Sequence, residues 1–288
     1  MIQKIAQSLY SDTPEELLYH YTTISGLKGI VESQSIWASD VRYMNDSAEL
    51  QYIISLLKDC SESFQHHKKF LNQFIDWMSH RVANGHMVFA ISFRANGNLL
   101  SQWRGYSQIG KGVSIGFKTE DIVSLAKPRG FQLGACIYQR DKQVALINDV
   151  IENLLHIAQG RELNVALADF DSLFNQIEAD MLKIAALLKH PSFVEEDEWR
   201  LVSPAITDYL GEPVHFREGT SMMIPYYQFP LVDNQLLKEQ NAIPVKHVFV
   251  GPTPNSTLSL NSIALYLKQH GVDLGNTISY CDIPYRSK

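Results

Sequence analysis

Hydrophobic side chains in the first third of the chain recur every three to four positions, as they do on one face of an amphipathic helix. This spacing predicts three helices, over residues 24–31, 50–57 and 71–82. Asp46 and Glu49 stand three positions apart just before the second helix, which is capping-box spacing and marks its start. A short apolar segment at residues 17–21 precedes the first helix and predicts a strand.

Farther along the chain, the hydrophobic period changes to that of strands, returns to that of helices, and changes again. Residues 87–93 form a nearly continuous apolar run of strand length, and the pattern turns helical over about residues 142–188. The other predicted strands are 113–117, 131–137, 198–202, 213–216, 245–250 and 277–281, and a further helix covers 256–270. That helix and its two flanking strands could form a βαβ unit. Because helices and strands come in blocks, the pattern predicts an α+β fold.

The domain organisation follows from the absence of breaks in the pattern. No repeat, low-complexity tract or Gly/Ser linker interrupts the sequence, and 288 residues can share one core. We therefore expect a single domain over residues 1–288. The helical block at about 140–190 carries no chemical motif, so we expect it to be an insertion packed against the sheet or over a cleft.

Composition and charge describe an ordinary globular chain. Hydrophobic residues make up 45% and charged residues 19%, and the formal net charge is −6. That net negative charge argues against electrostatic binding of nucleic acid or anionic lipid over a broad surface. The N-terminus has no signal-peptide pattern, and no apolar run approaches the ~20 residues of a membrane span. We expect a soluble, cytoplasmic protein of bacterial type.

Several well-known signatures are missing from the sequence. It contains no GxxxxGK[ST] phosphate loop, no GxGxxG and no HExxH. The three cysteines, Cys60, Cys136 and Cys281, are widely spaced and form no CxxC pair, so we expect reduced thiols and neither a disulfide framework nor a metal site.

The first candidate cluster is His20-Tyr21-Thr22-Thr23, where a strand ends at a threonine placed to cap the following helix. A single histidine in such a place is more often structural than functional.

The second cluster comprises Ser92 and the segment Gln102 to Tyr106. If this segment is a short helix, Trp103 and Tyr106 can share a face. Two such aromatic residues usually belong to a core. Polar and glycine neighbours also suit a ring that stacks on a planar ligand.

The third cluster is the acidic run that leads into Glu198-Trp199-Arg200. Period-two alternation would place Glu196 and Glu198 on one strand face, followed by Arg200. Two carboxylates and a guanidinium so placed would perturb each other's ionisation, as functional sites often require. A structural ion pair between Arg200 and a glutamate explains the same pattern equally well.

Together these clusters resemble the bacterial domain-of-unknown-function family 2971. The resemblance rests on these segments, which span nearly the whole chain: Tyr19-His20-Tyr21-Thr22, Asn45 to Glu49, Ser92-Phe93, Trp103 to Tyr106, Gly112 to Phe117, Glu196 to Arg200, Pro225-Tyr226 and Gly251-Pro252. Ser92-Phe93 departs from the family, which more often has Phe-Ser, and Ser47 stands where proline is usual.

This pattern is in turn similar to the ADP-ribosyltransferase superfamily, which implies a split β-sheet that binds NAD. The likeness implies that His20 binds a ribose hydroxyl, that Trp103 or Tyr106 stacks on nicotinamide, and that Glu198 is the catalytic carboxylate. It also implies that Glu196 helps to deprotonate the acceptor. Tyr21, Thr22, Ser92 and Arg200 complete the expected NAD site, with NAD as substrate and no metal.

The chemistry agrees with this set of residues. Cleavage of the nicotinamide–ribose bond builds positive charge on the ribose, which a fixed carboxylate stabilises. The expected activity is transfer of ADP-ribose to a macromolecular acceptor, protein or nucleic acid, in a bacterial effector, toxin or phage-defence setting. Two alternatives remain: a catalytically inactive ligand-sensing or protein-interaction module on the same fold, and a nucleic-acid-processing effector.

Overall fold

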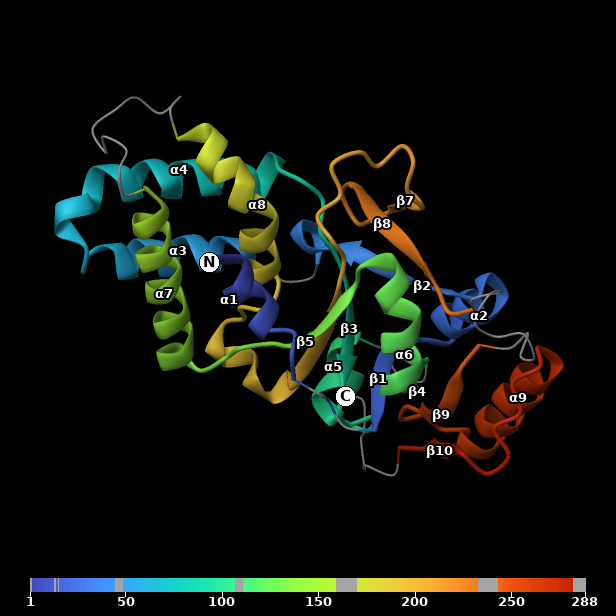
Figure 1. Ribbon diagram of the computed structural model, residues 1–288. Helices are drawn as coiled ribbons and strands as arrows, with labels where there is room; N and C mark the ends of the chain where they lie inside the picture. Colours follow the sequence, from blue (N-terminus) through green and yellow to red (C-terminus); the bar gives the residue numbers. More distant parts are fainter. Residues whose placement is uncertain are drawn as a thin grey trace.

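The computed structural model describes residues 2–12, 14, 16–44, 49–106, 111–158, 170–232 and 243–281, with the side chains of Glu49, Leu50 and Tyr106 outside this description. The fold is α+β, as the sequence pattern predicts, with one large mixed sheet flanked by helices (Figure 1). Among the described residues, no helix combines the length and the apolar character that crossing a bilayer requires.

The described strands are β1 (Leu17–Thr23), β2 (Ser35–Asp40), β3 (Phe89–Arg94), β4 (Gly112–Lys118), β5 (Gln132–Ala135), β6 (Glu198–Val202), β7 (Val214–Glu218), β8 (Met223–Pro230), β9 (Val245–Val250) and β10 (Ile278–Tyr280). The α-helices are α1 (Ile2–Ser8), α2 (Ile24–Ser33), α3 (Glu49–Ser61), α4 (Lys68–Asn84), α5 (Leu100–Tyr106), α6 (Thr119–Ala126), α7 (Arg140–Ala158), α8 (Asp171–Ala185) and α9 (Ser256–Gln269). Short 3-10 turns include η1 (Val41–Tyr43) and η5 (Pro191–Glu196).

Strand β3 is the point at which the sheet divides. One of its edges pairs with β6 from Ala90, opposite Val202, to Arg94, opposite Glu198. Its other edge is shared, because β1 pairs with it at Arg94 and β2 pairs with it at Phe89 and Ala90. Strand β1 continues into β4, β9 and β10, whereas β2 continues into β8 and β7. We call the place where β1 and β2 separate, beside Ile91 and Ser92, the fork.

One face of the sheet is covered by α2, α6 and α9, which bury their apolar stripes against it. Helix α2 begins where Thr23 accepts a hydrogen bond from the backbone N–H of Gly26, so the threonine caps the helix as its sequence position predicts. At the other end of the sheet, β9 and β10 are parallel with α9 between them, which confirms the βαβ unit.

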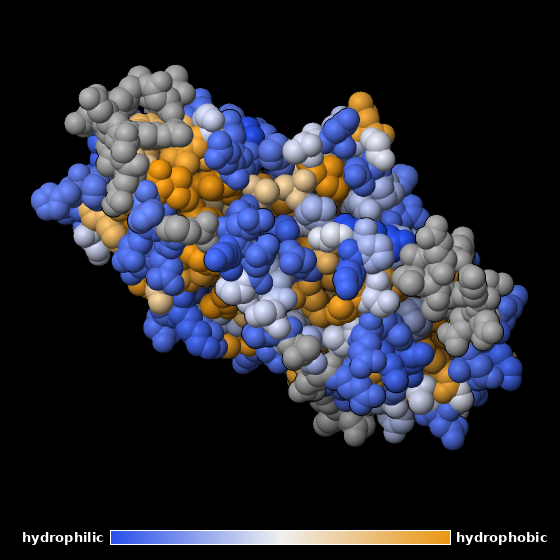
Figure 2. Space-filling model, in the orientation of Figure 1, coloured by the Kyte–Doolittle hydropathy of each residue, from blue (hydrophilic) through white to orange (hydrophobic). Residues whose placement is uncertain are grey.

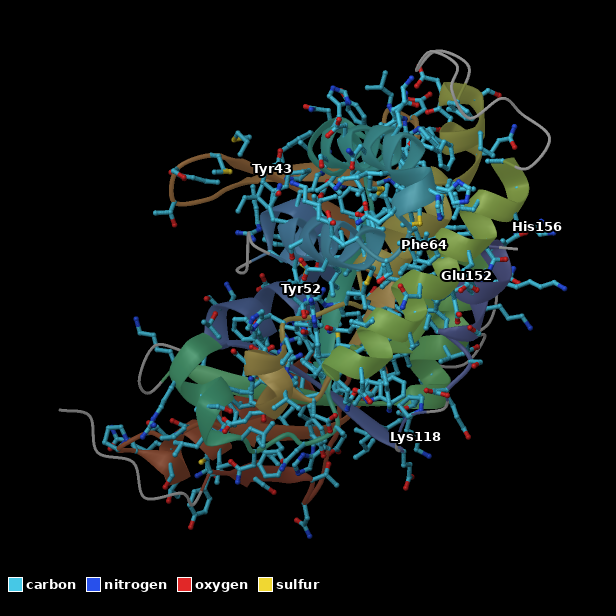
Figure 3. The ribbon with its side chains drawn as sticks, turned by 90° about the vertical axis from the view of Figure 1, so that its left-hand side faces the viewer. Tyr43, Tyr52, Phe64, Lys118, Glu152 and His156 are labelled. Carbon is cyan, nitrogen blue, oxygen red and sulfur yellow. The ribbon has the colours of Figure 1, made fainter. Side chains whose placement is uncertain are left out.

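The remaining long helices form a lobe beside the sheet, built from α1, α3, α4, α7 and α8 around a core of their own (Figure 1). The predicted block at 140–190 supplies α7 and α8. Helix α7 packs on α1 and α3, while α8 packs on α1, α3 and α4. Seen from the side of this lobe, Glu152 and His156 of α7 point away from it (Figure 3).

The sequence analysis expected this block to pack on the sheet or over a cleft. Its main partners are instead other helices, because its apolar stripe meets those of α3 and α4, for example where Phe174 contacts Phe70 and Phe74. The lobe does reach the sheet, since Ala90 of β3 and Val202 of β6 belong to the same core.

Candidate functional site

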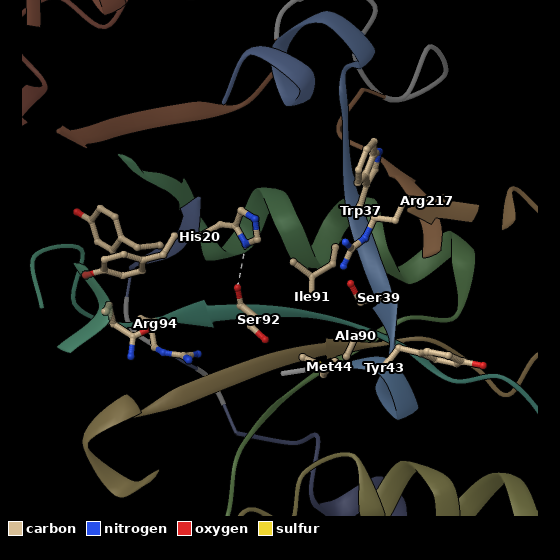
Figure 4. A pocket seen from close by; sticks show the side chains of 13 residues that line it. His20, Trp37, Ser39, Tyr43, Met44, Ala90, Ile91, Ser92, Arg94 and Arg217 are labelled. Carbon is tan, nitrogen blue, oxygen red and sulfur yellow. Dashed lines mark hydrogen bonds between the residues drawn. The ribbon is translucent and has the colours of Figure 1, made fainter. Parts of the chain in front are cut away.

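Two cavities lie at the fork, and Figure 4 shows the residues that line the inner one. The inner cavity, of about 180 Å³, lies against β3 and includes Ser92 and Arg94 in its wall. The outer cavity, of about 530 Å³, lies between β2 and α2. Four side chains line both, namely His20, Trp37, Ser39 and Arg217. The two cavities therefore adjoin where β1 diverges from β2.

His20 lies at the centre of this site. Its Nδ1 is 3.0 Å from the backbone carbonyl oxygen of Ser92, across the fork. A carbonyl can only accept, so Nδ1 carries the hydrogen and donates. Burial lowers the pKa of His20, and the positive charge of Arg94 lowers it further, although the Ser92 carbonyl opposes both. The ring is therefore neutral near pH 7, and its Nε2 is left as a hydrogen-bond acceptor.

The backbone of Ser92 is the second polar feature of the fork. In an antiparallel ladder the N–H and C=O of successive residues point alternately to the two edges. Ala90 and Arg94 use the edge away from β6 to pair with β2 and β1, so Ser92 between them faces that same edge. The register gives Ser92 no partner strand there, and its N–H and C=O are directed into the fork.

A buried group of charges lies on the other side of Arg94. Glu198, which is 2% exposed, contacts three cations. Its carboxylate is 3.0 Å from Nε of Arg200, 2.6 Å from Nζ of Lys189 and 3.4 Å from Nη1 of Arg94. Burial by itself would raise the pKa of Glu198, but Arg200, Arg94 and Lys189 outweigh it and hold that pKa well below its usual range. Glu198 is therefore ionised at all ordinary pH values.

Glu196 joins the same group from a different element. Its Oε2 is 2.6 Å from both Nη2 of Arg94 and Nζ of Lys189. The sequence analysis placed Glu196 and Glu198 two apart on one strand, but β6 begins at Glu198 and Glu196 ends the turn η5. Asp197 between them has a φ of 41°, in the left-handed region, so the strand period does not extend through it. Shared cations, rather than strand alternation, bring the two carboxylates together.

The structure thus separates the expected site into two layers. His20, Tyr21 and Ser92 line the inner cavity, and His20 and Thr22 line the outer one. Neither Glu198 nor Glu196 is among the described residues that line these cavities. Arg94 is the link, because it forms part of the inner wall and contacts both glutamates.

Arg200 and Trp103, both predicted to bind NAD, lie away from the cavities. Arg200 is buried, and besides Glu198 it bonds the backbone carbonyl of Ala186, which matches the structural ion pair considered above. Trp103 is 4% exposed and packs edge-on against Tyr21, so it belongs to the core. Its ring supports the cavity wall from behind. The side chain of Tyr106, the other predicted stacking residue, lies outside the described residues.

Sequence reasoning missed several cavity residues: Trp37, Ser39, Arg94 and Arg217. Of these, only Arg94 carried a local signal, as a charged residue at the end of the apolar run 87–93. The others come from β2 and β7 and meet His20 only through long-range pairing.

Metal ligands do not gather in the part of the chain that the structure describes, where no three His, Cys, Asp or Glu side chains are grouped so as to hold an ion. The side chains of Cys60, Cys136 and Cys281 are all buried.

Comparison with known proteins gives one match, to a protein family. No curated protein and no solved structure matches the chain. Residues 102–201, from α5 to β6, match the family described as protein of unknown function (DUF2971), and the match includes Glu196, Glu198 and Arg200. This match supports the likeness of the chain to that family.

Proposed function

We propose that the fork binds NAD and that the protein is an NAD-dependent ADP-ribosyltransferase, which cleaves the nicotinamide–ribose bond and passes ADP-ribose to a macromolecular acceptor. One observation carries the proposal: neutral His20 presents an acceptor nitrogen to a cavity formed where two arms of a sheet diverge. A split sheet with a histidine-bearing strand at the split is what the superfamily resemblance implies.

In this proposal, Nε2 of His20 accepts a hydrogen bond from a ribose hydroxyl. The backbone N–H and C=O of Ser92 are a matched pair for the carboxamide of nicotinamide, which has one acceptor and one donor group. Tyr21 contributes an apolar wall, held in place where its hydroxyl donates to the carbonyl of Asn96 and accepts from the N–H of Leu99. These contacts supply orientation, which is one of the larger contributions to catalysis.

Glu198 supplies the negative charge that the ribosyl cation needs. Arg94 lies between this carboxylate and the cavity, so the proposal includes movement of Arg94 away from Glu198 when NAD binds. The Arg94–Glu198 contact of 3.4 Å is the longest of the three charge contacts to Glu198, while Arg200 and Lys189 continue to hold the carboxylate.

Glu196 is the more accessible carboxylate, with a side chain that is 15% exposed. It is therefore assigned to the acceptor, from which it removes a proton during transfer. Its position on η5, outside β6, suits a group that meets a second substrate at the surface.

A second function is favoured by the ion pairs of Glu198. A carboxylate that contacts three cations is poorly placed to stabilise a fourth positive charge. If Arg94 stays in place, the same fork is an NAD-binding sensor without turnover, and Arg94 and Arg217 then serve binding alone.

The test is NAD binding by calorimetry together with nicotinamide release, for the wild type, Glu198→Gln and Glu196→Gln. The enzyme requires binding and release by the wild type, with release by Glu198→Gln lower by about a hundredfold to a thousandfold. NAD affinity should change much less than turnover. Glu196→Gln should reduce labelling of an acceptor more than simple hydrolysis of NAD.

Because Glu198 is also part of a buried charge group, each variant is compared at a temperature where its thermal unfolding curve shows it folded. NAD binding without nicotinamide release by the wild type, across several protein and nucleic-acid acceptors, would establish the sensor. Wild-type turnover by Glu198→Gln would remove that residue from the mechanism.

A further inference from the structure

We infer that Arg217 binds the diphosphate of the dinucleotide, and that the outer cavity takes its adenosine half. This inference rests on the proposed NAD site and adds the orientation of NAD within it. Arg217 lies on β7, and its side chain forms part of the wall of both cavities. In the close view it stands beside Trp37, above Ser39 (Figure 4). A ligand that extends from one cavity to the other must pass it.

The charges at the fork favour an anion. The described residues that line the two cavities include two guanidinium groups, Arg94 and Arg217, and no carboxylate. This is the reverse of the whole chain, whose formal net charge is −6. The charge of Arg94 is met by Glu196 at 2.6 Å. The side chain of Arg217 forms no ion pair or hydrogen bond with the residues that the structure describes, so its guanidinium group can bind an anion.

The outer cavity has the room and the aromatic surface that the adenosine half of the ligand needs. Its volume of about 530 Å³ exceeds the volume of about 180 Å³ of the inner cavity. Its wall includes Trp37, which is 48% exposed and stacks on Tyr226 with ring centres 4.3 Å apart. A large exposed ring supported from behind is suited to stacking on a base.

The opposite wall of the outer cavity comes from α2, at Gly29. A Cβ atom added at Gly29 would meet nothing within 4 Å, and Gly29 forms part of the cavity wall. Gly29→Leu should therefore place its side chain in the cavity. It also replaces a glycine within a helix by a good helix former, so the variant should fold.

The experiment measures binding of NAD, ADP-ribose and nicotinamide riboside to the wild type, Arg217→Gln and Gly29→Leu. Calorimetry serves for the first two ligands and ligand-detected NMR for the third. Loss of a charge-assisted contact to phosphate should weaken NAD and ADP-ribose about tenfold to a hundredfold in Arg217→Gln. Gly29→Leu should weaken the same two ligands. Nicotinamide riboside, which lacks both the diphosphate and the adenosine, should bind the variants as it binds the wild type.

Arg140→Gln is the matched control, because Arg140 pairs with Asp59 on the helical lobe, away from the fork. It should bind all three ligands as the wild type does. Undiminished NAD affinity in Arg217→Gln would overturn the inference and leave the proposed function standing, as would equal weakening of nicotinamide riboside.

Two further outcomes separate this inference from the proposed function. A wild type that binds ADP-ribose or inorganic diphosphate through Arg217, but not NAD, would uphold the anion site and reject NAD as the ligand. A wild type that binds none of these ligands would overturn both.

Discussion

The two edges of β3 have opposite characters. On one edge, β6 pairs with every residue from Ala90 to Arg94, and the charged side chains beyond the ladder satisfy each other. On the other edge, β1 and β2 each pair with one end of the strand and leave Ser92 facing a cavity. Both edges carry polar groups in the middle of a buried sheet. They differ in how the protein meets these groups, since a complete strand pairs with the edge beside β6, whereas on the other edge the carbonyl of Ser92 accepts a hydrogen bond from the His20 side chain.

This difference indicates where a ligand belongs. We call the edge of β3 that pairs with β6 the closed edge, and the edge that faces the cavity the open edge. Buried polar groups are nearly always hydrogen-bonded, and those of the closed edge already have partners, so a bound molecule would add no hydrogen bond there. The open edge has donors and acceptors that a ligand can meet. The sequence analysis took a histidine in the place of His20 as more often structural, and left Glu198 open between a functional carboxylate and a structural ion pair. The comparison of the two edges places His20 beside a cavity and Glu198 within a network of charges.

The largest expected loss in the free energy of unfolding comes from a substitution on the closed edge. Glu198→Ala removes the carboxylate that Arg200, Lys189 and Arg94 share, and breaking such a buried group by removing one partner costs about 3–5 kcal/mol. Urea unfolding followed by circular dichroism measures the loss.

The matched change on the open edge is Ser92→Ala. It removes a hydroxyl that makes no hydrogen bond with the described residues, so the free energy of unfolding should stay within about 0.5 kcal/mol of the wild type. Similar losses in the two variants would contradict the contrast between the edges.

A smaller change in the free energy of unfolding, of opposite sign at two glycines, is the next prediction. Gly134 of β5 stands opposite Arg200, and a methyl group there would lie 2.7 Å from Leu187 and 3.0 Å from the carbonyl oxygen of Leu9. Gly134→Ala should therefore cost about 1–3 kcal/mol. Gly29→Ala, on the open side, should gain up to about 1 kcal/mol, because the helix loses a glycine and nothing obstructs the methyl. Thermal unfolding of both variants tests the signs, and a stabilising Gly134→Ala would mean that the closed side is loosely packed.

The smallest effect is a pH dependence at the fork. The pKa of His20 is lowered mainly by burial, so between that pKa and the unfolded value of about 6.5 the unfolded chain binds a proton that the folded ring does not. The free energy of unfolding should therefore fall as the pH drops below about 6.5. His20→Gln should make this slope shallower.

His247 is the control for that slope, since burial also lowers its pKa. Measuring urea unfolding at several pH values for His20→Gln, His247→Gln and the double variant assigns the slope to each ring. An unchanged slope in His20→Gln would mean that the fork is open enough for the ring to take up a proton in the folded state.

Much of the fold was predictable, because local pattern controls it. The strand at 198–202 matches β6, and the helical stripes of α2, α4 and α9 occur where the spacing predicts them. His20 was found because a strand and a helix cap adjoin it in sequence. The pairing of Arg200 with Glu198 followed from alternation on one strand face.

The rest of the site was not predictable because it depends on pairing between distant segments. Strand β2 is short and half polar, and β8 contains Pro225 and Pro230, which argue against a strand. No local pattern shows that these two segments pair, yet their pairing places Trp37 and Ser39 beside His20. Lys189 likewise reaches both glutamates from a loop with no motif.

The hairpin of β7 and β8 also carries large apolar side chains at the surface. Phe216, Met222 and Met223 are each about half exposed or more, and hydrophobic residues are visible at its tip (Figure 2). None of these three side chains lines the cavities at the fork.

The pairing of β2 with β8 has a consequence for synthesis of the protein on the ribosome. Residues 35–39 find their partners at residues 226–230, so one arm of the sheet stays unfinished until most of the chain has been made. During that interval β2 exposes a free edge, the kind of surface that invites aggregation. Such non-local pairing also slows folding, because the chain loses the entropy of closing a long loop before the stabilising contacts form. The cavity would then be among the last parts of the molecule to form, and a chain cut short before β8 would carry His20 without the wall that faces it.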